Sequence, residues 1–187
     1  MALKEQIVRL ASPDGKERDA AAEEIYIAGS ILARRAAKAW LKDGEFVSLV
    51  GAEPKITVGV AVPRTLFERI RAANGMPRLA EVPPDQDAEE FELHFPGLSF
   101  DVLTSKAPEG NGAIARYLGK FGAGIQQVEF LCNDVDRATK VLRERFGIAP
   151  IYPETRAGAD GTRVNFFLVT TPEEEKVLIE LYEKKDA

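Results

Sequence analysis

The sequence predicts an α+β protein built from two similar modules, residues 54–104 and 125–183, behind an N-terminal helical extension. The extension, residues 1–50, contains an alanine-rich segment in which apolar residues recur at helical spacing. Each later segment begins with an apolar strand, continues with a helical pattern and ends in alternating strands. The pattern repeats after about 70 residues, which indicates an internal duplication. Residues 51–187 are therefore predicted to form one domain of two strand-helix-strand-strand-strand modules.

The extension is predicted to be mainly one helix from Gly15 to Lys42. Its apolar stripe consists of Ile25, Ala28, Leu32, Ala36 and Trp40. Asp43-Gly44 is expected to end this helix, and Glu45–Val50 is expected to form a short strand. Such a stripe favours a packing or oligomer-contact role, so a homodimer is one possible state.

The first module begins with the strand Ile56–Val62 and a helix from Leu66 to Asn74. Thr65 and Glu68 have the spacing of a capping box at the start of that helix. Three strands are expected to follow: Leu79–Val82, Glu90–Phe95 and Leu98–Leu103.

A short helix, Asn111–Lys120, capped by Asn111, is predicted to connect the modules. The second module has the strand Gln126–Leu131 and the helix Val135–Phe146, entered through Asn133-Asp134 and stopped by Gly147. Strand material at Ala149–Tyr152, a glycine-rich turn at Arg156–Gly161 and two strands, Arg163–Val169 and Lys176–Glu183, complete it.

Composition narrows the classes of function. The net charge of -5 and pI of about 5.1 do not favour nucleic acid as a partner. No apolar run approaches the roughly 20 residues of a membrane helix, and the charged N-terminus is unlike a secretory signal. Cys132 is the single cysteine, which excludes a disulfide or a cysteine-based zinc site within one chain. We expect a cytoplasmic protein in which Cys132 is a buried small hydrophobe rather than a reactive thiol.

Three stretches carry a family resemblance: GNGAIARYLGKFGAGIQQVEF, IYPETRAGADGTRVNFF and KVLIELYE. Together with the duplicated pattern from Pro54 to Glu183, they resemble the vicinal-oxygen-chelate superfamily, and within it the methylmalonyl-CoA epimerases. The resemblance implies a cup between the modules that binds a small molecule and a divalent metal. It also implies an isomerase or lyase that stabilises the enolate of a small carbonyl or thioester compound. The alternative is a metal-free binding or sequestering protein of the bleomycin-resistance type.

The resemblance places the metal ligands on the first and last strands of each module, at Thr57, Asp101, Gln127 and Glu180. The family has histidines where this sequence has Thr57 and Gln127. Of these four positions, Asp101, Gln127 and Glu180 are the candidate metal ligands. Two carboxylates and two neutral oxygens favour Mg, Mn or Ca over zinc, or an empty site. The expected cofactor is a divalent metal, Mg, Mn or Co, or none.

The strand Gln126–Leu131 raises the question of which face its polar residues line. Gln127 and Glu129 alternate with Val128, Phe130 and Cys132, so the two sets lie on opposite faces. Either Gln127 and Glu129 line the cup, with Glu129 near Asp101 and Glu180, or the register differs by one and they face solvent. In a cup, at least one of the three carboxyl groups is expected to keep its proton near neutral pH, and either to act as a general acid or to donate a hydrogen bond to an oxyanion of the ligand.

Four residues are catalytic candidates: Glu180, Glu129, Asp85 and His94. His94, the single histidine, shares a strand face with Glu92; it is a general base, a substitute ligand or an exposed bystander. The resemblance makes Asp85, in VPPDQDAEE, a proton-transfer carboxylate, and the acidic run around it is also typical of a solvated loop.

Substrate binding is assigned to Thr57, Gln127, Arg163 and Asn165. Arg156 and Arg163 flank the glycine-rich turn, where they either pair with an anionic substrate or serve solubility.

Overall fold

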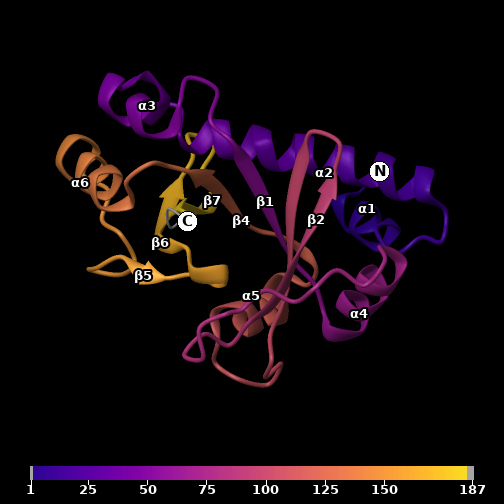
Figure 1. Ribbon diagram of the computed structural model, residues 1–187. Coiled ribbons are helices and arrows are strands. Elements are labelled where there is room, and N and C mark those ends of the chain that lie inside the picture. The colour runs from indigo at the N-terminus through magenta and orange to yellow at the C-terminus, as the bar shows by residue number, and fades with distance from the viewer. Residues whose placement is uncertain (1, 185–187) are drawn as a thin grey trace. The chain divides into compact units, whose positions relative to one another are not determined.

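The computed structural model describes residues 2–184 and confirms the α+β class. The chain forms two compact units. The first contains residues up to Gly29 together with Val58–Gln126, and the second contains Ser30–Thr57 together with the residues from Gln127 onward. The division falls within three elements: α2 (Gly15–Ala36), β1 (Ile56–Ala61) and β4 (Gly124–Leu131) (Figure 1). No helix within residues 2–184 combines the length and apolar character that crossing a membrane requires.

The first unit is built around three strands in the order β2-β3-β1. β3 (Leu98–Thr104) pairs parallel with β1 and antiparallel with β2 (Glu89–Phe95), which confirms the predicted hairpin. Its helices are α1 (Leu3–Arg9), α4 (Arg64–Ala73) and α5 (Ala113–Phe121), besides the first part of α2. Aromatic contacts join the helices to the strands. The ring centres of Phe67 in α4 and Phe91 in β2 are 4.7 Å apart, and those of Tyr26 in α2 and Phe100 in β3 are 6.1 Å apart.

The second unit repeats this arrangement with strands in the order β4-β7-β6-β5. β7 (Lys176–Glu183) pairs parallel with β4 and antiparallel with β6 (Arg163–Thr170), and β6 pairs with the short β5 (Arg156–Ala157). Helix α6 (Val135–Phe146) has the predicted ends: the Asp134 side chain accepts the Arg137 N–H at 2.9 Å, and Gly147 adopts a left-handed φ of 67°.

The buried face of α2 differs from the predicted stripe. Ile25 is fully buried as expected, but Ala28 is exposed, and the contact with the sheet is made at Gly29. A Cβ built on Gly29 lies 2.6 Å and 2.7 Å from the two methyl groups of Val58 in β1. The helix therefore approaches the strand at a residue without a side chain, a contact that hydrophobicity patterns do not reveal.

The strand predicted at Glu45–Val50 is wrong, because these residues lie in the helix α3 (Gly44–Val50). Asp43 starts this helix: its side chain accepts the N–H groups of Glu45 at 3.0 Å and Phe46 at 2.9 Å. Helix α2 ends at Ala36, before α3, and a short 3₁₀ helix, η1 (Trp40–Lys42), follows it. The ring centre of Trp40 lies 5.6 Å from that of Phe46 and 6.4 Å from that of Phe167.

Four further local predictions are wrong. Leu79–Val82 and Ala149–Tyr152 form no strand. The Thr65 capping box is absent because α4 begins two residues earlier, at Arg64 after Pro63, and α5 is preceded by Gly112 rather than by Asn111. At these two helices the boundary moves by less than a turn, and the order of the elements is retained.

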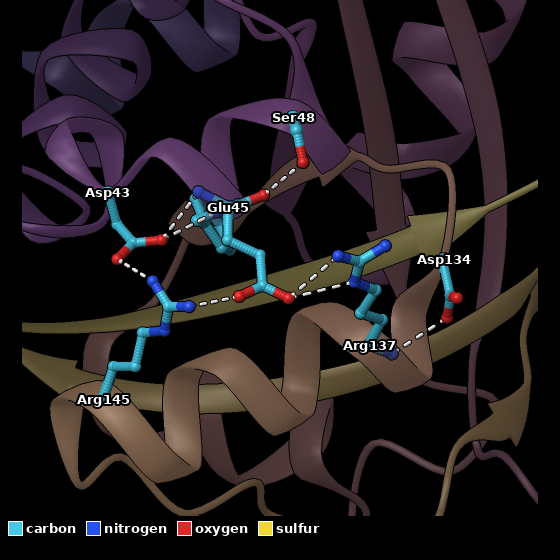
Figure 2. A network of polar contacts seen from close by, with 7 residues as sticks. Asp43, Glu45, Ser48, Asp134, Arg137 and Arg145 are labelled. Atoms are coloured by element: carbon cyan, nitrogen blue, oxygen red, sulfur yellow. Dashed lines mark hydrogen bonds and ion pairs between the residues drawn. The ribbon is translucent and has the colours of Figure 1, made fainter.

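An ion-pair network joins α3 to α6 within the second unit (Figure 2). Arg145 binds Asp43 at 2.7 Å and also Glu45, and Glu45 accepts a 3.0 Å hydrogen bond from Arg137. The Phe46 N–H, and after it Arg145, lower the pKa of the Asp43 carboxyl group. The end of the N-terminal extension is thus bonded to the second module.

Candidate functional site

The polar residues of β4 lie on the same face of the sheet as the acidic residue of β7. Glu129 is paired with Glu180, and Glu180 is paired with Phe166 of β6. Since directly opposite residues of neighbouring strands share a face, and Gln127 lies two residues from Glu129, all four lie on one face. Val128, Phe130, Ile179 and Phe167 occupy the opposite face and are fully buried.

Gln127 holds two carboxylates together. Its Nε2 donates one hydrogen bond to Glu129 Oε1 at 2.9 Å and another to Glu180 Oε2 at 2.8 Å. Gln127 is 8% exposed and Glu129 6%, whereas Glu180 is half-buried. We call these three residues the Gln127–Glu129–Glu180 cluster. Both N–H groups of the amide are directed at acidic oxygens, which offsets the repulsion between two neighbouring carboxylates. Glu180 is the member that a ligand reaches from solvent.

Three further predicted residues belong to the second unit. Thr57 is buried in β1. Arg163 and Asn165 lie on the face of β6 opposite to Phe166. Asn165 is fully buried, accepts the Phe166 N–H at 2.9 Å and donates to the Tyr152 carbonyl at 3.4 Å. Arg163 binds Asp136 and Glu183, each at 2.5 Å, and these hydrogen bonds raise the pKa of its guanidinium. The structure therefore gives Arg163 an ion-pair role in binding α6 to the sheet.

In the first unit, β2 and β3 carry His94 and Asp101 on one face. Glu92 is directly opposite Asp101, and the His94 Nε2 lies 3.0 Å from the Glu92 Oε2. The His94 side chain is 72% exposed, as the bystander interpretation expects. Asp85 is exposed in the loop before β2. A site that Asp101, Asp85 and His94 share with the Gln127–Glu129–Glu180 cluster stays a prediction.

Cys132 lies at the end of β4 and is 3% exposed. Burial raises the pKa of its thiol to about 12, so the nucleophilic thiolate is not available at neutral pH. The interpretation of Cys132 as a small buried hydrophobe is confirmed.

Tyr152 contacts both Phe166 and Arg156 near the cluster, and the sequence did not predict these contacts. The Tyr152 ring lies 6.1 Å from the Phe166 ring, and the Arg156 guanidinium carbon lies 4.3 Å from the Tyr152 ring centre. Sequence reasoning singled out Arg156 but not its aromatic support. The alternation of RVNFFLV predicts that Phe166 and Phe167 lie on opposite faces of the strand. The position of Tyr152 could not be predicted, because it lies in a loop.

The side chains of the Gln127–Glu129–Glu180 cluster do not fit a strong transition-metal site. Gln127 presents its amide nitrogen to the acids, and an amide N–H group donates hydrogen bonds and ligates no metal. Within residues 2–184, no three histidine, cysteine or acidic side chains gather as a possible metal-binding group. The predicted Mg, Mn or Co site therefore remains a prediction without support from this donor set.

The duplicated arrangement of strands and helices is the vicinal-oxygen-chelate fold. Solved structures that resemble this chain are methylmalonyl-CoA epimerases. The Mycobacterium tuberculosis enzyme shares 29% sequence identity, with a TM-score of 0.56 over 70% of this chain and 87% of the other. A single-residue variant of the Streptomyces coelicolor enzyme, solved with 2-nitronate-propionyl-CoA, shares 25% identity, with a TM-score of 0.55 over 70% and 96% of the two chains. An epimerase solved with methylmalonyl-CoA and NH4+ shares 25% identity, with a TM-score of 0.54 over 69% and 92%.

No protein-family model matches the sequence, and no curated protein matches it. The likeness to the epimerases is therefore carried by the fold together with 24–29% identity. It supports an epimerase-like fold of this superfamily.

Proposed function

We propose that the protein is an isomerase or lyase that moves a proton at the carbon next to the carbonyl of a small carbonyl or thioester compound. The observation that carries the proposal is the pair of hydrogen bonds from one amide to Glu129 and Glu180. They hold two carboxyl groups side by side on an epimerase-like fold. The epimerase structures crystallised with coenzyme A esters make an acyl thioester the first substrate class to test.

In this proposal Glu180, which is half-buried and reaches solvent, takes the proton from carbon as a general base. The electron pair of the C–H bond moves toward the carbonyl carbon, and the carbonyl oxygen gains negative charge. Glu129, when protonated, donates a hydrogen bond to that oxygen, as a buried carboxylic acid does in other enolising sites. Return of a proton from Glu180 to the same face restores the carboxylate and the starting compound, so this step exchanges the α-proton; inversion requires a second acid on the other face of the enolate. Gln127 positions both groups throughout and changes no bond.

The test is exchange of the α-proton of methylmalonyl-CoA in deuterium oxide, followed by mass spectrometry. The wild type is expected to accelerate exchange, and Glu180→Gln is expected to lose at least 100-fold of the acceleration, within the range that one general base contributes, about 10²–10⁴-fold. Glu173→Gln, an exposed glutamate in the turn before β7, is the matched control and keeps the wild-type rate. Exchange that is unchanged in Glu180→Gln contradicts the proposal.

A second function is a binding protein of the bleomycin-resistance type that does no chemistry. It is favoured by the two hydrogen bonds of Gln127, which direct both of its N–H groups at Glu129 and Glu180. Gln127 stands where the epimerase pattern has a metal-binding histidine, so the two carboxyl groups have no neighbouring imidazole. This function predicts that an acyl thioester binds while its α-proton exchanges no faster than in buffer.

A further inference from the structure

In the second unit, the strand face that carries the Gln127–Glu129–Glu180 cluster also carries a cation. Arg156 of β5 is directly opposite Val164 of β6, and Val164 lies two residues from Phe166 on the same face. Phe166 is opposite Glu180. Arg156 therefore belongs to the same face as Glu180, whereas Arg163 belongs to the other.

Arg156 is held in place by stacking. Its guanidinium lies over the ring of Tyr152, which contacts Phe166 edge-on at an interplanar angle of 77°. A planar guanidinium on an aromatic face loses less freedom when it binds a carboxylate, because part of its orientation is already fixed. Arg156 and Tyr152 are both half-buried. The five N–H donors of arginine allow it to bind a ligand while it keeps its contacts within the protein.

The two arginines beside the glycine-rich turn thus have different roles. Arg163 binds two carboxylates of the chain, Asp136 and Glu183, and anchors α6. Arg156 stacks on Tyr152, which together with Phe166 forms a half-buried aromatic surface next to Glu180. An arginine presented on an aromatic surface is typical of the recognition of organic anions.

Strand geometry gives the spacing between the cation and the acids. Arg156 and Glu180 are two strands and two residues apart, which places their Cα atoms about 12 Å from each other at ordinary strand spacings. Because strand side chains stand roughly perpendicular to the sheet, the tips of two parallel side chains are about as far apart as their Cα atoms. With one hydrogen bond at each end, a ligand that contacts both then has its two polar groups roughly 5–8 Å apart. A carboxylate on the reacting carbon itself is too close to span this distance.

We propose that the ligand is an acyl thioester whose acyl chain ends in a second, remote carboxylate. Arg156 binds that carboxylate, Tyr152 and Phe166 line the apolar spacer, and the thioester carbonyl lies at the Gln127–Glu129–Glu180 cluster. This inference rests on the proposed function, because it takes the cluster as the place where the carbonyl binds. It makes Arg156 the residue that selects for the length and charge of the acyl chain.

The experiment is calorimetric titration with three acyl-pantetheines that lack nucleotide phosphates. Adipyl-pantetheine has a remote carboxylate about 6 Å from its thioester carbonyl. Methylmalonyl-pantetheine has a near carboxylate, and propionyl-pantetheine has none. The wild type is expected to bind the adipyl compound roughly 10- to 100-fold more tightly than the propionyl compound, the range for a charge-assisted hydrogen-bonded pair.

Arg156→Ala is expected to abolish this preference, and Arg156→Lys to keep part of it, since a lysine retains the charge without the fork. Arg143→Ala, an exposed arginine on α6, is the matched control and keeps the preference. Far-ultraviolet circular dichroism of each variant checks that the fold is intact. Equal binding of adipyl- and propionyl-pantetheine to the wild type overturns the inference, and so does a preference that persists in Arg156→Ala.

Propionyl-CoA is the remaining probe. If Arg156→Ala weakens propionyl-CoA as much as adipyl-pantetheine, the arginine binds a phosphate and the remote carboxylate is refuted. Failure of this inference is distinct from failure of the proposed function. Glu180-dependent exchange of methylmalonyl-CoA, with acyl binding indifferent to Arg156, refutes the role of Arg156 and leaves the proposed function standing.

Discussion

Gln127→Leu removes both hydrogen bonds that hold Glu129 and Glu180 together while keeping a side chain of similar size. Hydrogen bonds to charged groups contribute about 1.5–3 kcal/mol each. Both carboxylates have further contacts within the protein, and Glu180 is partly screened by solvent. We therefore expect a total loss of about 2–4 kcal/mol rather than twice the single-bond maximum.

Urea denaturation measures this loss directly, and calorimetry should record a fall in Tm of roughly 5–15 °C for a chain of this length. Gln126→Leu is the matched control. Gln126 is the adjacent residue on the opposite face of β4, and within residues 2–184 its buried Oε1 has no hydrogen-bond partner. Replacing it costs about 0–1 kcal/mol.

A double-mutant cycle assigns the effect to the cluster. In a Glu129→Leu background, Gln127→Leu should cost at least about 1 kcal/mol less than in the wild type, because one acceptor is already gone. If Gln127→Leu is as mild as Gln126→Leu, or if the two substitutions are additive, the amide does not hold the carboxylates together and the cluster is not a unit.

Four other perturbations test separate features. Gln127→His should raise affinity for Zn or Co in a calorimetric metal titration, because an imidazole replaces a neutral amide; no gain would mean that the carboxylates do not converge on a cation. Gly29→Ala should destabilise by about 1–3 kcal/mol in urea through contact with Val58, whereas Gly119→Ala, with no atoms within 4 Å, should stabilise, and equal effects would contradict the close approach. Asp43→Asn keeps the helix cap but removes the charge. Because the folded pKa of Asp43 is lowered from 3.8, its ionised form stabilises the fold above about pH 4, and the wild-type advantage in chemical denaturation should disappear as pH falls below that, not as it rises. Cys132 should fail to react with a disulfide reagent at pH 8 until the protein is denatured, and rapid labelling of the native protein would refute its burial.

Helix α6 and strand β4 of the second module were predictable because their signals are local. Asp134 caps α6 and Gly147 ends it as the sequence indicates, and the alternation of GIQQVEFL fixes which residues share a face. The partners of Gln127 were not predictable. Periodicity places Gln127 and Glu180 on the same side of a sheet, but the hydrogen bonds between them depend on strand pairing across 53 residues.

The N-terminal extension shows where sequence reasoning fails. EFVSLV has the apolar and β-branched composition of a short strand, yet it is helical because Asp43 caps the segment and Phe46 packs on Trp40. Its polar residues, Glu45 and Ser48, are three apart, which is helical spacing, and six residues are too few for composition to decide. In the same way, Ala28 and Gly29 are nearly equivalent in a hydrophobicity profile, and only the approach of Val58 determines which one is buried.

The chain contains one tryptophan, and its position makes it an internal reporter. Trp40 is 2% exposed between Phe46 of the extension and Phe167 of β6, and all three belong to the second unit. The fluorescence emission of Trp40 should shift to longer wavelength when water enters the core around Phe46 and Phe167. It does not report on the strands and helices of the first unit. Far-ultraviolet circular dichroism, in contrast, averages over both. Comparing the two signals during denaturation therefore reveals whether the duplicated halves unfold together or one after the other.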